Sequence, residues 1–326
     1  MSNVLITIPS YNNKGSILKL LDSLKEQTYK KFEIAIFLKC SQTEFDKDLL
    51  DKIACYNSLS ISIIKQQSGY FDEAMNLIFN YTDSGIVLNT DDDATVSKTW
   101  VSDHLKIHSK YPKIGMASGI VIENILKSPI MNFLYNQKWR INKHTFIDKP
   151  ISKIFSNFGM YVGKSGMLVD TGPKYNIKTL KLRGVNMSWK AETLQGFKLL
   201  RYTLRGTHNE AAAGIEVLRR GYIPINFNNG AVYHPLHNSL SRTDSPLSFP
   251  SLLSIESVLF AYNTSKFFKI DLNILKKRTF VDDIITRIIT KNKNTGYSTG
   301  FSIVKYSLEK SLSPKSVREL IKKVSY

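Results

Sequence analysis

The sequence has few cysteines and no long apolar run. Two cysteines, Cys40 and Cys55, occur among 326 residues, with no CxxC pair and no paired histidine ligands. Their scarcity excludes a disulfide framework and a cysteine-based zinc site, and it favours the reducing cytoplasm. No apolar run approaches the roughly 20 residues that cross a bilayer, and the start of the chain shows no basic leader. We therefore expect a cytoplasmic protein.

Acidic residues are scarce relative to basic ones. The chain has 27 Asp and Glu against 45 Lys and Arg, which gives a formal net charge of +18. Such an excess attracts nucleic acid, an acidic membrane surface or phosphorylated substrates, and charge alone does not choose among them. Much of it lies late in the chain, at Lys276, Lys277, Arg278, Lys291, Lys293, Lys315, Arg318, Lys322 and Lys323. This distribution favours a solvated basic surface.

Short apolar runs alternate with helical patterns in the first 90 residues. Strands are expected at 4–8, 32–38, 59–64 and 85–89, with apolar residues at helical spacing at 17–24 and 74–78. This alternation predicts a mainly parallel sheet flanked by helices, a Rossmann-like α/β fold. Because ligands collect at the carboxyl ends of parallel strands, the loops after Ile8, Leu38 and Asn89 should line one crevice.

Periodicity weakens after this region. Residues from about 125 to 170 mix aromatic, glycine and basic residues, so we expect irregular structure near a site. A helix is expected over 214–220 with Gly221 at its C-terminal cap, followed by strands at 222–227 and 231–234.

Prolines at residues 246 and 250 mark the best domain boundary. They divide an α/β domain over 1–245 from a basic, mainly helical C-terminal extension over 246–326. Within the extension, apolar residues recur at i, i+3, i+4 and i+7, namely at Val317, Leu320, Ile321 and Val324, and predict an amphipathic helix. Docking of this stripe against the domain is favoured over contact with an anionic membrane.

Three consecutive carboxylates, Asp91, Asp92 and Asp93, follow the apolar run at 86–88. Alone they would repel one another, and a divalent cation would relieve the repulsion. Strand periodicity predicts that Asp91 and Asp93 face the same side, as two-point ligation of Mn²⁺ or Mg²⁺ requires. The alternative is a solvated acidic turn. The position at the end of an expected parallel strand favours the metal site.

Several segments occur in a recognisable order. They are residues 4–12, Gln27-Thr28-Tyr29 with Phe32-Glu33-Ile34, Gly69, Asn76, the three aspartates, the segment 183–188, and Asn209-Glu210 ahead of Gly221-Tyr222. In this order and spacing the chain resembles the family 2 glycosyltransferases of the GT-A fold over roughly residues 1–242. The resemblance implies a domain that binds a nucleotide sugar and transfers its sugar.

The resemblance also implies roles for individual residues. Nucleotide-sugar binding is expected from Pro9, Ser10, Tyr11, Asn12, Gly69, Asn76, Asp91, Asp92 and Asp93. A metal ion would be held by Asp91, Asp93 and His234, and the catalytic base would be Glu210. The acceptor side would include Gly184, Asn186 and Ser188.

Glu210 and His234 each have a structural alternative. Residues 207–210 fit a capping box, and an acidic residue in a first helical turn is favoured by the helix dipole. His234 ends an apolar run, where a histidine satisfied within the core or a turn is common. The metal role of His234 and the base role of Glu210 therefore depend on the resemblance.

The sequence departs from the family pattern at two places. Leu38-Lys39 stands where family members usually carry one or two aspartates that read the nucleobase, and Asn209 replaces the first carboxylate of a Glu-Asp pair. The QxxRW motif and membrane spans of the processive synthases are missing, which argues for transfer of a single sugar.

We therefore expect a metal-dependent, inverting glycosyltransferase that moves one sugar from a nucleoside diphosphate sugar to a hydroxyl of a glycan or lipid-linked acceptor. A peripheral contact with an anionic membrane is compatible with the charge. The alternatives are a non-catalytic nucleotide-sugar-binding relative, and a basic nucleic-acid-binding protein that charge alone supports.

Overall fold

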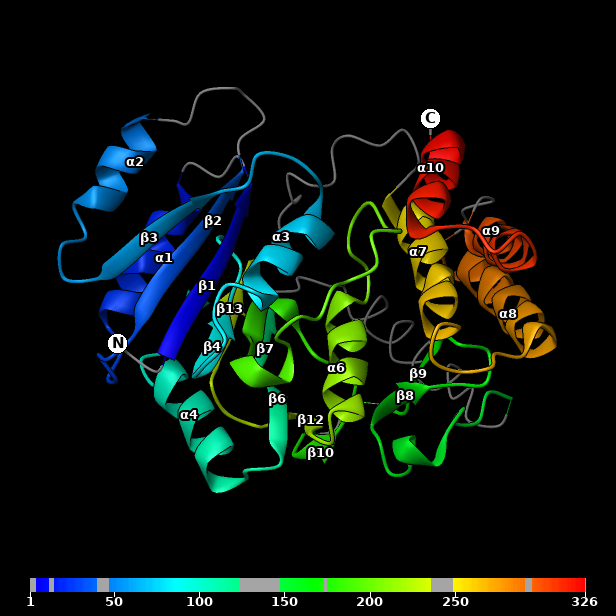
Figure 1. Cartoon of the computed structure of the whole chain (residues 1–326), viewed down its shortest axis with the longest axis horizontal. Helices are drawn as coiled ribbons and strands as arrows, with labels where there is room; N and C mark the ends of the chain where they lie inside the picture. Colours follow the sequence, from blue (N-terminus) through cyan, green and yellow to red (C-terminus); the bar gives the residue numbers. More distant parts are fainter. Residues whose placement is uncertain are drawn as a thin grey trace.

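The computed structural model describes residues 4–11, 15–39, 47–123, 147–172, 175–235, 249–290 and 295–325. Its centre is an eight-stranded sheet with the strand order β10-β12-β6-β11-β4-β1-β2-β3 (Figure 1). The strands are β1 (Val4–Tyr11), β2 (Glu33–Lys39), β3 (Ser60–Lys65), β4 (Ile86–Asn89), β6 (Ile114–Ser118), β10 (Ile177–Lys178), β11 (Met187–Lys190) and β12 (Ile223–Asn226). The pairs of β1 with β2 and β4 are parallel, whereas β11 is antiparallel to β4 and β6.

Helices cover both faces of this sheet. They are α1 (Ser16–Lys25), α2 (Lys47–Ala54), α3 (Phe71–Phe79), α4 (Trp100–Lys110) and α6 (Asn209–Arg219). One core holds apolar residues of α1, α2 and α4 against alternate residues of β1 and β2. The other holds residues of α3 and α6 against Trp189 and the opposite side of β2 and β4. The mainly parallel α/β fold expected from the alternating pattern is confirmed. The bounds of the expected strands differ from the observed ones by one residue, except that β1 ends three residues later, at Tyr11.

Strands β1 and β4 separate at the carboxyl end of the sheet. Their pairing ends at Thr7 and Asn89, and Pro9, which has no backbone N–H, lies beyond this pair. Strand β1 continues beside β2 as far as Tyr11. The sheet reverses its strand order at β1, since β2 and β3 follow on one side and β4 lies on the other. Loops at such a point are where α/β sheets bind ligands.

Two smaller sheets flank the main one. The strands β5 (Thr95–Val96), β13 (Val232–His234) and β7 (Val121–Glu123) form one, and β8 (Met160–Val162) pairs with β9 (Leu168–Asp170) in the other. Short 3-10 helices occur at Lys153–Phe155, Gly184–Asn186 and Ala191–Thr193. Within the region expected to be irregular, the described part thus contains a small antiparallel sheet. Helix α6 ends before Gly221, whose φ of 82° confirms the predicted glycine cap.

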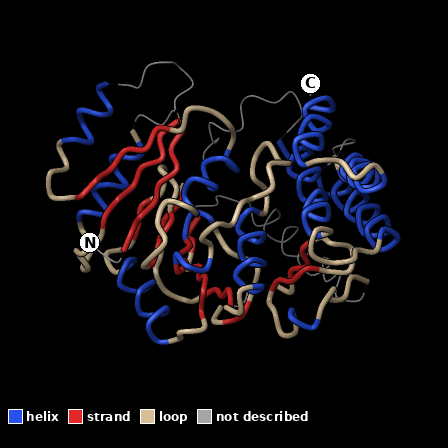
Figure 2. The backbone as a smooth tube through the Cα atoms, in the orientation of Figure 1, coloured by secondary structure: helices blue, strands red, loops and turns tan. Residues whose placement is uncertain are grey.

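Four helices follow, α7 (Phe249–Thr264), α8 (Leu272–Thr290), α9 (Tyr297–Glu309) and α10 (Pro314–Ser325), and Figure 2 shows them gathered at one end of the molecule. They share a third core, which also includes Met167 and Tyr202 of the preceding region. Gly300 lets α9 approach α7 closely, because a Cβ there would lie 2.8 Å from Val258 Cβ. The predicted boundary at residue 245 lies outside the described residues, and the two-domain division stays a prediction.

The C-terminal amphipathic helix is confirmed as α10. Val317 and Ile321 are fully buried in the third core, Leu320 packs against it, and Val324 is 43% exposed. The stripe therefore docks against the protein, as the pattern favoured. None of the described helices combines the length and the apolar character needed to span a bilayer.

Candidate active site

A cavity of about 320 Å³ opens at the carboxyl ends of the central strands. It is lined by Phe71 of α3, Asp91 after β4, Glu123 of β7, Leu182, Arg183, Gly184 and Val185 of the segment before β11, Glu210 of α6, and His234 of β13. Residues from six separate parts of the chain thus meet at one point. Four of the residues singled out from the sequence, Asp91, Gly184, Glu210 and His234, are among them.

Two carboxylates and an imidazole form a compact group at this cavity. Ligand atoms of Asp91, Asp93 and His234 all lie within 4.8 Å of one another. His234 Nε2 is 3.2 Å from Asp93 Oδ1 and 4.0 Å from Asp91 Oδ2. Carboxylate oxygen and neutral imidazole nitrogen are ligands for divalent cations such as Mn²⁺. These three residues therefore suit a divalent metal ion.

Asp91 and Asp93 face the same side, as predicted, but strand alternation is not the reason. Strand β4 ends at Asn89, and Asp91, Asp92 and Asp93 lie in a turn, so strand alternation does not orient them. Ser10 Oγ donates a 2.6 Å hydrogen bond to Asp92 Oδ2, which directs that carboxylate toward the end of β1. Asp91 and Asp93 instead face His234.

The charges at this group perturb one another. Burial, followed by the charge of Asp93, raises the pKa of Asp91 to about 7, and Asp92 and Glu210 add to the effect. The hydrogen bond with Asp93 is the largest cause that raises the pKa of His234. Carboxylates whose ionised forms are disfavoured in this way gain from a bound cation.

Glu210 lies in the first turn of α6 and projects into the cavity. Burial raises its pKa, while backbone N–H groups of Glu210 and Gly184 and the charge of Arg183 oppose the shift. A Cβ at Gly184 would lie 2.5 Å from Glu210 Oε1, so a side chain there would displace the Glu210 carboxylate. The structural alternative, a capping box at residues 207–210, is wrong: the N-cap is His208, with φ 69° and no capping hydrogen bond from its side chain. Glu210 is therefore not part of a capping box.

Hydrogen bonds hold in place the backbone segment that contains Gly184 and Asn186. Asn89 Nδ2 donates a 2.8 Å hydrogen bond to Gly184 O, and Thr7 Oγ1 donates a 3.0 Å bond to Asn89 Oδ1. Asn186 is fully buried and its amide nitrogen donates to the carbonyls of Ile120 and Gly230, both at 2.7 Å.

Asn186 and Ser188 support the cavity from within the core. The Asn186 side-chain oxygen also meets Trp100 and His104 at 2.9 Å, and Ser188 Oγ lies 2.7 Å from His104 Nδ1 and 2.8 Å from His108 Nε2. Burial lowers the pKa of His104 to about 4 and that of His108 to about 3, so both imidazoles are neutral at pH 7. Neither Asn186 nor Ser188 lines the cavity, and their acceptor role stays a prediction.

The residues expected to bind the nucleotide are not all gathered at the cavity. Ser10 contacts Asp92, and Tyr11 lies beside Lys39, whose Nζ is 5.0 Å from the Tyr11 ring centroid and donates to Gly69 O. Gly69 has φ 96°, and a Cβ there would collide with the Glu73 side chain.

Two of these residues lie elsewhere or cannot be placed. Asn76 uses its amide to bind the backbone of Leu199, at 3.2 Å and 2.6 Å, rather than to line the cavity. Asn12 lies outside the described residues. The nucleotide-binding roles of both stay predictions.

Sequence reasoning missed several residues of the cavity wall. Phe71, Glu123 and Leu182 belong to no motif that we recognised, and Val185 lies in the segment 183–188 without having been given a role. Arg183 forms an ion pair with Glu123 across the cavity wall. Its position directly before Gly184, in a segment already singled out, was the one available signal.

Comparison with known proteins points to one class of enzyme. The family model described as "Glycosyl transferase family 2" matches residues 5–165. No curated protein sequence matches the chain significantly.

Solved structures share the overall arrangement. The mannosyltransferase PcManGT from Pyrobaculum calidifontis, in complex with GDP-Man and Mn²⁺, superposes with a TM-score of 0.54 at 13% identity, covering 98% of this chain and 84% of that one. S. aureus TarS superposes with a TM-score of 0.50 at 13% identity, covering 93% of this chain and 55% of that one. At these identities the likeness shows the fold.

Proposed function

Because the chain belongs to glycosyl transferase family 2, we propose that it transfers one sugar from a nucleoside diphosphate sugar to an acceptor hydroxyl with inversion of the anomeric centre. The observation that carries this proposal is the shared cavity. The half-buried carboxyl of Glu210 and the Asp91, Asp93 and His234 group line or adjoin the same 320 Å³ space. A base and an acidic cation site in one cavity suit displacement of a diphosphate.

Glu210 is the proposed catalytic base. Its carboxylate takes the proton of the acceptor hydroxyl as the hydroxyl oxygen bonds to the anomeric carbon. The bond from that carbon to the diphosphate oxygen breaks, and its electron pair leaves with the nucleoside diphosphate. The raised pKa of Glu210, which burial causes, makes the carboxylate a stronger base than an exposed glutamate. Attack on the face opposite the leaving group inverts the anomeric centre.

We propose that Asp91, Asp93 and His234 hold Mn²⁺ or Mg²⁺. A divalent cation there would neutralise charge on the diphosphate leaving group. The complex of PcManGT with GDP-Man and Mn²⁺ supports this assignment by analogy of fold. Pro9, Ser10, Tyr11, Asn12, Gly69, Asn76 and Asp92 are proposed for the nucleotide-sugar side, with Gly184 facing the acceptor beside Glu210.

The first test is turnover of nucleotide sugars by the wild type and by Glu210→Gln. Removing a general base should lower kcat by about 100- to 10,000-fold, with the KM of the donor nearly unchanged. Glu216→Gln is the matched control, because Glu216 lies on the same helix, pairs with Arg219 and Arg220, and is not among the residues that line the cavity. Wild-type rates in Glu210→Gln would remove this residue from the mechanism, whereas donor binding without any turnover would favour a non-catalytic relative.

The second test concerns the metal. Asp93→Asn and thorough chelation should each lower kcat by at least about 100-fold, because a metal ion supplies several kcal/mol of charge stabilisation. Added Mn²⁺ should restore the chelated wild type but not the variant. Asp83→Asn, an exposed aspartate before β4, should behave as the wild type. Undiminished activity after chelation would eliminate a metal-dependent mechanism.

A peripheral contact with an anionic membrane is proposed on α8. Phe280, Ile284 and Ile288 are 63%, 41% and 73% exposed at spacings of four residues, with Lys276, Lys277 and Arg287 exposed on the same helix. Its acidic residues, Asp282 and Asp283, are buried. An apolar stripe flanked by cations suits the surface of an anionic bilayer, where lipid-linked acceptors are held.

Vesicle co-sedimentation tests this contact. The wild type should bind vesicles that contain anionic lipid and not neutral ones, and Phe280→Ser/Ile288→Ser should abolish the binding. Val324→Ser, at an exposed apolar position on α10, is the control. Equal binding by the double variant would exclude α8 as the contact.

A further inference from the structure

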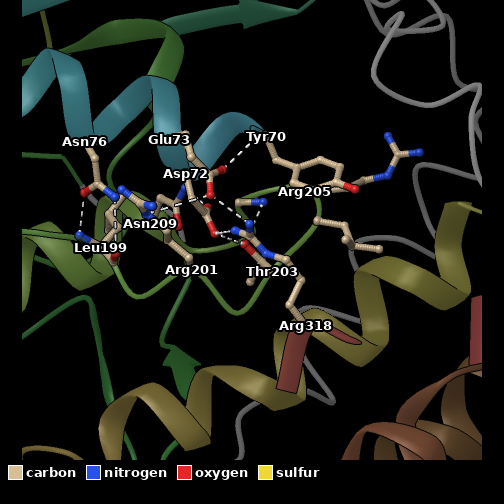
Figure 3. A network of polar contacts seen from close by, with 12 residues as sticks. Tyr70, Asp72, Glu73, Asn76, Leu199, Arg201, Thr203, Arg205, Asn209 and Arg318 are labelled. Atoms are coloured by element: carbon tan, nitrogen blue, oxygen red, sulfur yellow. Dashed lines mark hydrogen bonds and ion pairs between the residues drawn. The ribbon is translucent and has the colours of Figure 1, made fainter. Parts of the chain in front are cut away.

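A buried ion-pair network joins the C-terminal helix α10 to α3 (Figure 3). Arg318 is 8% exposed, and its Nη2 lies 3.1 Å from Asp72 Oδ2 while its Nη1 lies 2.7 Å from Glu73 Oε1. The guanidinium also lies over the ring of Tyr70, 5.1 Å from the centroid. One arginine thus bridges two neighbouring carboxylates at the start of a helix that packs on the central sheet.

The network continues from Asp72 to α6. Asp72 is fully buried and accepts hydrogen bonds from Asn209 Nδ2 at 2.8 Å and Thr203 Oγ1 at 2.7 Å. Thr203 Oγ1 in turn accepts from the N–H of Gly206 at 3.1 Å. Gly206 has φ 73°, and a Cβ there would lie 2.5 Å from Asn209 Nδ2. The turn that leads into α6 is therefore packed directly against Asp72.

Helix α7 holds the other side of the same turn. Glu256 is fully buried, and its carboxylate accepts from the backbone N–H groups of Leu204 at 2.7 Å and Arg205 at 3.0 Å, and from Thr207 Oγ1 at 2.7 Å. The residues before α6 are thus fixed between an acid of α3, which Arg318 neutralises, and an acid of α7. Both α7 and α10 belong to the C-terminal helices.

Two residues of the network are direct sequence neighbours of residues that line the cavity. Asp72 directly follows Phe71, and Asn209 directly precedes Glu210; Phe71 and Glu210 both line the cavity. Residues of one helical turn move together, so a shift of Asn209 carries Glu210 with it. The amide at position 209 also fits this place, because an acid there would face the carboxylate of Asp72 instead of donating to it.

We propose that Arg318 is a positioning residue for the sugar transfer: through Asp72 and Asn209 it fixes the first turn of α6 and thereby the carboxylate of Glu210. The inference rests on the proposed role of Glu210. It makes the C-terminal helices part of the active site's support, although none of their residues lines the described cavity.

Loss of Arg318 should act through the charge state of Asp72. Burial already raises the pKa of Asp72, and the hydrogen bonds from Thr203 and Asn209 and the charge of Arg318 oppose it. Glu73 and the buried Tyr202 also face this carboxyl, and neither can replace the cation. Without Arg318 the carboxyl should take up a proton at higher pH, and a protonated Asp72 accepts hydrogen bonds from Thr203 and Asn209 more weakly than the carboxylate does.

A double-mutant cycle tests the proposal. Arg318→Met and Asn209→Ala should each lower kcat by about 10- to 100-fold with donor KM within about twofold, the scale of a small misplacement of a reacting group. The double variant should lose no more than the worse single variant, because both act through one path. Lys305→Met is the control, since Lys305 pairs with Glu309 on α9 at 3.8 Å and should leave kcat unchanged.

The pH profile separates positioning from a general loss of stability. In Arg318→Met the acid limb of kcat should move to higher pH, and part of the activity should return above that limb. Arg318→Lys keeps the charge but lacks the forked guanidinium that reaches both carboxylates, so it should show a smaller loss and a smaller shift than Arg318→Met. If Arg318→Met does not fold, the cycle is run with Arg318→Lys.

Two results would overturn the proposal. One is multiplicative losses in the double variant, and the other is a folded arginine variant with wild-type kcat and pH profile. Failure of the proposed function looks different: there the wild type transfers no sugar, or Glu210→Gln keeps its activity. An active wild type, an inactive Glu210→Gln and an unaffected Arg318→Met would reject only the role of Arg318.

Discussion

Asp72 and Asp91 show two opposite surroundings for a carboxylate in one protein. Burial is the largest cause that raises the pKa of each. Around Asp72, the hydrogen bonds from Thr203 and Asn209 and the charge of Arg318 work against that shift. Around Asp91, three further acids add to it, and His234 is the one opposing cause.

This difference separates a structural acid from one that we propose to be a metal ligand. The chain supplies a cation and two donors to Asp72, so its charge is balanced when the protein folds. Asp91 lines the cavity beside Asp93, and we propose that a cation from solution balances their charge. An acidic cluster that the fold leaves with excess negative charge is a better guide to a metal site than acidity alone.

The largest expected effect is the loss of stability when Asp72, whose charge is balanced, is removed. Asp72→Ala should lower the free energy of unfolding by about 3–5 kcal/mol, because it leaves the Arg318 guanidinium buried without this partner. Urea unfolding measures the change. Asp48→Ala, at a side chain 71% exposed and paired with Lys52, should cost below about 1 kcal/mol. Similar losses for the two would refute the distinction.

A metal ion should stabilise the folded protein only through the Asp91 site, and not through Asp72. At a concentration 100 times its Kd, Mn²⁺ should raise the free energy of unfolding by about 2.7 kcal/mol in the wild type. Asp91→Asn should show little of this gain, and Asp72→Asn should keep it if the variant folds. Thermal unfolding with and without Mn²⁺ supplies the measurement. A full gain in Asp91→Asn would show that the ion binds elsewhere.

Without metal, removing the unbalanced charge should stabilise the protein. Asp91→Asn should raise the free energy of unfolding by an amount on the order of 1 kcal/mol, allowing for screening by water at a side chain that is 36% exposed. The same measurement on Asp83→Asn should show no gain. A destabilised Asp91→Asn would mean that the carboxylate is already balanced.

The smallest expected effect is the pH dependence of the stability that Asp91→Asn gains without metal. The pKa of Asp91 is raised from its usual 3.8 to about 7, so the folded state holds its proton at pH values where the unfolded chain has released it. Wild-type stability from this group is therefore full below about pH 4 and falls as pH rises toward 7. The advantage of Asp91→Asn in metal-free thermal unfolding should widen over the same range. A constant difference would indicate an unshifted pKa.

Local patterns were sufficient to predict most of the secondary structure. The apolar runs that become β1 to β4, the glycine after α6 and the stripe of α10 depend on residues close in sequence, and each was predicted near its observed position. The turn at Asp91 to Asp93 and the His208 N-cap were not, because they depend on contacts with Ser10, His234 and α7. Asn76, Asn186 and Ser188 show the same limit: a motif marks a residue without showing where its side chain points.

From the sequence alone we predicted an α/β fold and a resemblance to the family 2 glycosyltransferases, and we marked Asp91, Asp93, Glu210 and His234 as candidates. Only the tertiary structure brought β4, β13 and α6 to one cavity, and only it showed that Arg318, 246 residues from Asp72 along the chain, supports the turn before Glu210. The reason is physical. Periodicity and turn chemistry act between neighbours in sequence, whereas the charge balance of a buried carboxylate depends on every group that folding places around it.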